Sequence, residues 1–101
     1  MPGQLRIRAP HVATAGRPFD CAVEITGALP GDTVTIRLWQ TAGVHPLLDR
    51  TSQAVIDHQT NGTAVFLDVA LVGPCRAHLL ADDTMSAVPL AQDDMYIEVM
   101  P

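Results

Sequence analysis

The sequence predicts one all-β domain, a sandwich of about seven antiparallel strands in two sheets. Segments in which apolar and polar residues alternate recur along the 101 residues, and a period of two places successive side chains on opposite faces of a sheet. Turn residues separate these segments at intervals typical of a sandwich, about every 8–12 residues. No segment has the period of a helix.

The first three strands are expected over 4–9, 19–26 and 33–39. The turn at Pro30-Gly31-Asp32 separates the second from the third, because Pro fixes φ, Gly accepts positive φ and Asp bonds its own backbone. The side chains expected to face the core from the second and third strands are Phe19, Cys21, Val23, Ile25, Val34, Ile36 and Leu38.

The second half of the chain continues with a weak, irregular edge strand over 47–57. Asn61-Gly62 predicts the type I′ turn of a two-residue hairpin, because both residues readily take positive φ. The strand over 63–71 is expected to be central, and strands over 75–81 and 95–100 complete the fold. The expected inward side chains are Val65, Leu67, Val69, Cys75, Ala77, Leu79, Ile97 and Val99.

Composition and charge argue against two classes of partner. The formal net charge is −5, whereas a nucleic-acid partner requires a basic footprint. No apolar run approaches the roughly 18 residues of a membrane span, and the N-terminal residues lack the apolar segment of a signal peptide. We expect no nucleic-acid partner and no membrane partner, and synthesis in the host cytoplasm without export.

Two cysteines and a tryptophan carry a resemblance to a known superfamily. Cys21 opens the second expected strand, Trp39 ends the third, and Cys75 opens the sixth. This order resembles the immunoglobulin-like superfamily, and three turn phrases are similar to those of bacterial and bacteriophage immunoglobulin-like domains. These phrases span residues 15–18, 29–32 and 61–66. The resemblance implies an immunoglobulin-like β-sandwich and carries no active site.

Trp39 is the first candidate interface residue. Its parity puts it on the polar face with Thr35 and Arg37, and a Trp beside an Arg is typical of an interface anchor. The alternative is a β-bulge after Leu38 that turns the indole into the core, as the superfamily suggests. The acidic loop over 82–94 is the second candidate interface. Its apolar residues are Met85, Val88 and Leu90.

Cys21 and Cys75 are both expected to point inward at the same level of the sandwich. An inter-sheet disulfide would contribute about 4 kcal/mol in the chain-entropy model, whereas the missing export segment favours a pair of buried free thiols. Both possibilities stay open. Gly73 stands where the superfamily usually has a Tyr, two residues before the second Cys.

We expect no metal, cofactor or catalytic constellation. Asp82-Asp83 and Asp93-Asp94 flank the acidic loop and suggest a Ca²⁺ site as an alternative, because Ca²⁺ takes carboxylate oxygens. No ordered ligand spacing accompanies these pairs, and the histidines lack zinc-site spacing. The sequence has no nucleophile elbow and no Gly-rich phosphate loop, so we do not expect an enzyme.

These observations favour a non-enzymatic structural or binding module whose partner is a larger protein assembly. The short chain, the missing export segment and the acidic charge favour a bacteriophage virion accessory protein, such as a capsid decoration or tail-associated protein. The alternative is an immunoglobulin-like domain of a bacterial surface protein or adhesin that binds a glycan or a host protein. The first hypothesis predicts a location in the virion, and the second predicts the bacterial cell surface.

Overall fold

The computed structural model describes residues 3–42, 45–84, 86 and 89–101. These residues form eight strands and no helix, so they contain no helical segment able to cross a membrane. The strands are β1 (Gln4–Arg8), β2 (Val12–Thr14), β3 (Phe19–Thr26), β4 (Thr33–Ala42), β5 (His45–Val55), β6 (Asn61–Val69), β7 (Cys75–Asp83) and β8 (Asp93–Met100). The all-β prediction is confirmed.

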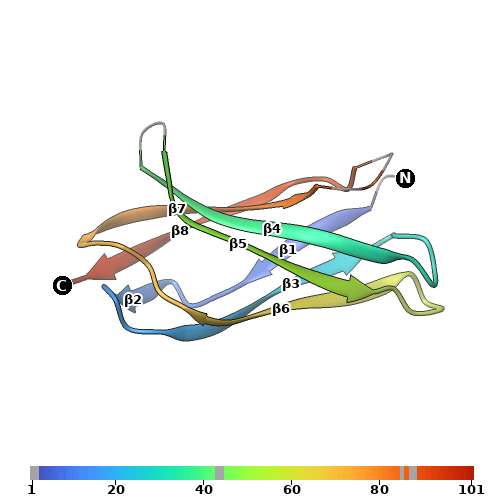
Figure 1. Ribbon diagram of the computed structural model, residues 1–101, viewed down its shortest axis with the longest axis horizontal. Coiled ribbons are helices and arrows are strands. Elements are labelled where there is room, and N and C mark those ends of the chain that lie inside the picture. The colour runs from blue at the N-terminus through green and yellow to red at the C-terminus, as the bar shows by residue number, and fades with distance from the viewer. Residues whose placement is uncertain (1–2, 43–44, 85, 87–88) are drawn as a thin grey trace.

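The strands form two sheets that pack as two layers (Figure 1). The three-stranded sheet has the order β1-β3-β6, and the five-stranded sheet has the order β2-β8-β7-β4-β5. The paired strands are antiparallel except β2 and β8, which run parallel with Val12 opposite Glu98. The expectation of antiparallel strands throughout is therefore wrong at this edge. Pro10 follows β1 and lacks a backbone N–H for its ladder, and the chain then crosses to the other sheet as β2.

An aliphatic core lies between the two sheets. The strict alternation of β3, β4, β7 and β8 gives each strand one buried face, and Phe19 at the start of β3 is only half-buried. The inward positions confirmed on these strands are Cys21, Val23, Ile25, Val34, Ile36, Leu38, Ala77, Leu79, Ile97 and Val99.

Strand β6 has the opposite parity from the one predicted, and it lies at a sheet edge rather than in the centre. Ala64 and Phe66 are buried, with Phe66 only 1% exposed. Val65 and Leu67, which were expected in the core, are 51% and 55% exposed. The prediction fails because both faces of this strand carry apolar residues, so hydrophobicity alone did not distinguish them.

A β-bulge at Asp68 explains how Val69 is nevertheless buried. Asp68 has a positive φ of 54°, and the register with β3 shifts at this point. Phe19 lies opposite Val69, whereas Cys21 lies opposite Phe66. Three steps along β6 thus match two steps along β3, and an extra residue of this kind reverses the alternation on one strand.

The chain reversal before β6 lies earlier than predicted. Asn61 and Gly62 are already part of β6 and pair with β3, so the predicted Asn-Gly turn is wrong. The reversal precedes them and includes Thr60, whose φ is 70°. The carboxylate of Asp57 accepts the backbone N–H groups of Gln59 and Asn61 at 2.9 and 3.0 Å. This side-chain capping organises the turn in place of the Asn-Gly geometry.

Side chains from β5 close the open side of the sandwich between β5 and β6. Arg50 Nη2 donates to the carbonyl oxygen of Leu67 at 2.9 Å, and Ser52 Oγ donates to that of Val65 at 2.9 Å. Both donors are on an edge strand and reach the edge of the opposite sheet. Edge carbonyls occupied in this way are withdrawn from pairing with another chain.

Candidate interaction face

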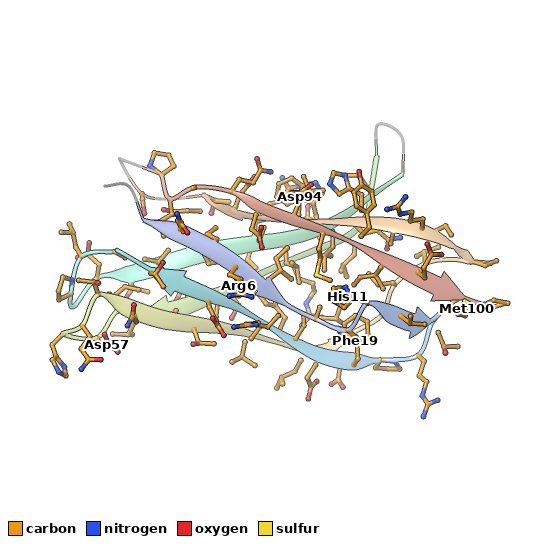
Figure 2. The ribbon with its side chains drawn as sticks, turned by 180° about the vertical axis from the view of Figure 1, so that it is seen from behind. Arg6, His11, Phe19, Asp57, Asp94 and Met100 are labelled. Carbon is orange, nitrogen blue, oxygen red and sulfur yellow. The ribbon has the colours of Figure 1, made fainter. Side chains whose placement is uncertain are left out.

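The outward face of the five-stranded sheet brings together side chains from four strands. Asp49, Trp39, Leu80 and Asp94 are successive cross-strand partners on β5, β4, β7 and β8. Side chains at such partner positions share a face and lie within contact distance. Trp39 therefore occupies the middle of a row that crosses this sheet. Asp94, at the β8 end of this row, is labelled in Figure 2.

Trp39 is on the outward face and is half-buried there. The alternation of buried residues continues past it from Leu38 to Gln40, and the register shift of β4 comes only after Gln40. The proposed bulge after Leu38 is therefore wrong. The physical reason is that the inward position after Leu38 is taken by Gln40, a fully buried polar residue.

An ion pair holds the indole in place. The guanidinium carbon of Arg37 lies 4.5 Å from the centroid of the Trp39 ring. The same guanidinium donates to both carboxylate oxygens of Asp49, from Nε and from Nη2, each at 2.8 Å. These hydrogen bonds lower the pKa of Asp49, and stacking of this kind is a cation–π contact. The group presents a Trp-Arg surface in which Asp49 orients the guanidinium beside the ring.

The flanks of this group are polar. Thr35 is half-buried on the same face, and its Oγ1 accepts a hydrogen bond from Gln53 Nε2 at 3.4 Å. Asp82 lies opposite Arg37 on β7. Partial burial raises the pKa of Asp82, an effect that Arg37 opposes.

A second aromatic group lies next to the first and was missed by the sequence reasoning. His78 and Tyr96 are stacked, with ring centroids 4.6 Å apart and planes 10° apart. The guanidinium carbon of Arg76 lies 4.5 Å from the Tyr96 centroid, and His78 Nε2 lies 2.6 Å from Asp94 Oδ2. The alternation of each strand places these residues on its polar face, but only the strand order brings them beside Trp39.

The structure describes only part of the acidic loop. Met85 and Val88 lie outside the described residues. Leu90 is half-buried and packs against the core, and its candidate interface role stays a prediction. Asp83 explains this position, because its carboxylate accepts the backbone N–H groups of Ser86 at 3.3 Å and Leu90 at 3.2 Å.

The paired aspartates of that loop are engaged separately. Asp83 holds the loop backbone, Asp94 contacts His78, and Asp93 Oδ2 accepts the backbone N–H of Ile7 at 2.7 Å. Within the described ranges, no three residues among His, Cys, Asp and Glu gather as a metal cluster would require.

The two cysteines do not form the expected buried pair. Both are free thiols, with Cys21 buried and Cys75 exposed, so the inward prediction for Cys75 is wrong. Cys75 has the parity of the buried Ala77 but lies at the very start of β7, where its Sγ donates to the carbonyl oxygen of Val72 at 3.2 Å. Burial raises the pKa of the Cys21 thiol to about 11, with Arg50 opposing the shift.

We expect one thiol of the native chain to react quickly with an aromatic disulfide reagent at neutral pH. Thiolate is the reactive form, and the raised pKa keeps Cys21 protonated at that pH, so the fast thiol is Cys75. Cys75→Ser should remove the fast phase, and denaturant should expose the second thiol. A native chain with no reactive thiol that gains two on reduction would instead show a disulfide.

The outward face offers two aromatic rings, each stacked with a guanidinium group, and carboxylates at their sides. Trp, Tyr and Arg are the residues enriched among interface hot spots.

No model of a known protein family matches the chain, and no curated protein matches it.

Proposed function

We propose that this chain is a non-enzymatic, immunoglobulin-like binding module that attaches to a larger protein assembly through the outward face of the five-stranded sheet. The assembly we propose is a bacteriophage virion, with the chain as a capsid decoration or tail-associated protein. The observation that carries the attachment is the Trp39-Arg37-Asp49 group, in which a half-buried indole is held by a two-pronged ion pair.

Support for the immunoglobulin-like assignment comes from the strand order. In the seven-stranded form of that fold the first, second, fourth and fifth strands share one sheet, and the third, sixth and seventh share the other. Among the described residues no strand takes the fourth place in the first sheet. Here β1, β3 and β6 share a sheet, and β4, β7 and β8 share the other. The additional β5 pairs with β4, as an extra strand does in the variable-type domains.

Support for attachment through this face comes from the contacts that orient its anchor and from its charges. Binding loses less free energy to side-chain ordering when an anchor is already held in its bound geometry, and Arg37 holds Trp39 in this way. Asp49 and Asp94 end the row that contains the indole. Complementary charge sets partner choice, and this face carries both signs, so the proposed partner surface has an apolar pocket bordered by charged groups of both signs.

Trp39→Ala is expected to weaken attachment by about 2 kcal/mol or more, roughly thirtyfold or more in affinity, because hot-spot truncation has this effect. Its free energy of unfolding should fall by only about 1 kcal/mol, the scale of a cross-strand side-chain pair. Leu67→Ala is the matched control, since Leu67 is exposed on β6 of the other sheet. Co-sedimentation of purified chain with phage particles from the source strain measures attachment, and chemical denaturation measures folding.

Three results would contradict the proposal. The first is equal sedimentation of Trp39→Ala and the unaltered chain. The second is a folding loss of about 3–5 kcal/mol, which marks a core aromatic residue. The third is absence of the chain from purified particles together with its recovery from the cell envelope, which would support the surface-protein alternative.

A further inference from the structure

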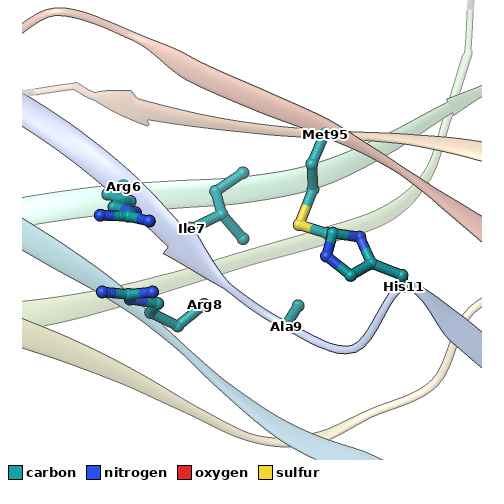
Figure 3. A pocket seen from close by; sticks show the side chains of 6 residues that line it. All are labelled: Arg6, Ile7, Arg8, Ala9, His11 and Met95. Carbon is teal, nitrogen blue, oxygen red and sulfur yellow. The ribbon is translucent and has the colours of Figure 1, made fainter.

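A groove of about 350 Å³ lies at the side of the sandwich between β1 and β8. It is separate from the outward aromatic groups, and Figure 2 shows Arg6 and His11 on this side of the molecule. Figure 3 shows its lining at close range. The lining residues are Arg6, Ile7, Arg8, Ala9, His11 and Met95.

Two hydrogen bonds, called ties below, connect β8 to β1 and to the segment that follows β1. The groove forms between these ties, where β1 and β8 separate. At one end the backbone N–H of Ile7 donates to Asp93 Oδ2 at 2.7 Å. At the other end the N–H of Glu98 donates to the carbonyl oxygen of His11 at 2.9 Å. Between these ties the chain crosses from one sheet to the other around Pro10. The opening is therefore built by the same crossing that makes β2 a parallel strand.

The groove is basic although the chain is acidic. Alternation along β1 puts Arg6 and Arg8 on one face, so two of the six arginines of a chain with net charge −5 lie here. Arg8 Nε holds the carboxylate of Glu24 at 2.8 Å. Arg6 is the cross-strand partner of the same Glu24 but, within the described part of the chain, has no carboxylate at ion-pair distance. Its guanidinium thus retains its donors for an incoming anion.

The floor of the groove is apolar. Ile7 is buried, Ala9 and Met95 are half-buried, and all three line the groove. His11 adds an exposed imidazole at the far end. The site therefore combines guanidinium donors with a surface for aliphatic atoms.

We infer that this groove binds a glutamate or aspartate side chain from an extended segment of a protein partner. A guanidinium group matches a carboxylate with two parallel hydrogen bonds, and the apolar floor accepts the neighbouring aliphatic groups of such a segment. A polyanion is a poor fit, because the net charge of −5 repels it. The inference does not depend on the outward face and would add a second point of attachment.

The test uses a short blocked peptide of valine and threonine that carries a single glutamate, titrated into the isotope-labelled full chain and followed by NMR. We expect shift changes at Arg6 to Ala9, His11 and Met95. Arg6→Gln should weaken binding about tenfold, the scale of one lost hydrogen bond between charged groups. Arg17→Gln makes the same charge change at an exposed position outside the groove and should leave the affinity unchanged.

Each of the following results would overturn the inference. The peptide with glutamine in place of glutamate binds equally well, or the peptide causes no shifts. Arg6→Gln with an otherwise unchanged spectrum binds like the unaltered chain, or Arg17→Gln weakens binding as much. Inorganic phosphate produces the same shifts at lower concentration, which identifies a simple anion site. The same shifts arise without peptide as protein concentration rises, which identifies a second copy of the chain.

Discussion

Phe66→Ala is expected to lower the free energy of unfolding by about 3–5 kcal/mol, as for other buried Phe residues. Leu67→Ala should change it by only about 0.5 kcal/mol, the scale of a surface substitution. The two residues are adjacent apolar positions on β6, yet Phe66 is 1% exposed and Leu67 is 55% exposed. The contrast therefore tests the parity of β6 before the bulge at Asp68.

Equilibrium denaturation with urea measures both variants, and a shift in midpoint with an unchanged slope identifies a change in stability alone. If Phe66→Ala does not fold, Phe66→Leu provides a milder test with an expected loss of about 1–3 kcal/mol. A larger loss for Leu67→Ala than for Phe66→Ala would restore the parity expected from the sequence and contradict the structure.

Gln40→Leu is expected to lower the free energy of unfolding by about 1–3 kcal/mol, because it leaves the partly buried N–H of Val72 without its partner, whereas the carbonyl oxygen of Val72 keeps the Cys75 thiol. Gln40 is fully buried. Its Nε2 donates to the carbonyl oxygen of Val72 at 3.0 Å, and its Oε1 accepts the N–H of Val72 at 3.2 Å. The amide thus takes the place of a neighbouring strand for the segment that joins β6 to β7.

Gln53→Leu is the matched control for Gln40→Leu, since Gln53 lies exposed on the adjacent β5 and donates to Thr35 Oγ1 at 3.4 Å. It should change stability by no more than about 0.5 kcal/mol. Hydrogen exchange adds a local measurement, because the Val72 N–H should exchange faster in Gln40→Leu. Equal stability of the two variants, with unchanged exchange at Val72, would show that the buried amide is dispensable.

The sequence by itself determined the fold class and most inward faces. The turn at residues 29–32 is confirmed, with Gly31 at a φ of 84° and the N–H of Asp32 donating to Leu29 O at 3.2 Å. Alternation and turn chemistry are local properties, so a single segment contains all the information that they require. Trp39 on the outward face also follows from parity alone.

The tertiary structure decided the features that depend on neighbouring strands. The bulge at Asp68 arises from the pairing of β6 with β3. The sequence of either strand alone therefore does not predict it. Gln40 is polar in sequence and buried in the fold, because its partner Val72 comes from a distant loop.

The candidate sites depend on tertiary structure for the same reason. Tyr96 stacks with His78 beside the Trp39 row because β8, β7 and β4 are neighbours. The groove at Arg6 exists because β1 and β8 separate between their two ties. Alternation predicts the face of the strand on which a side chain lies. Packing of the whole core sets the order of the strands, and that order decides which side chains meet.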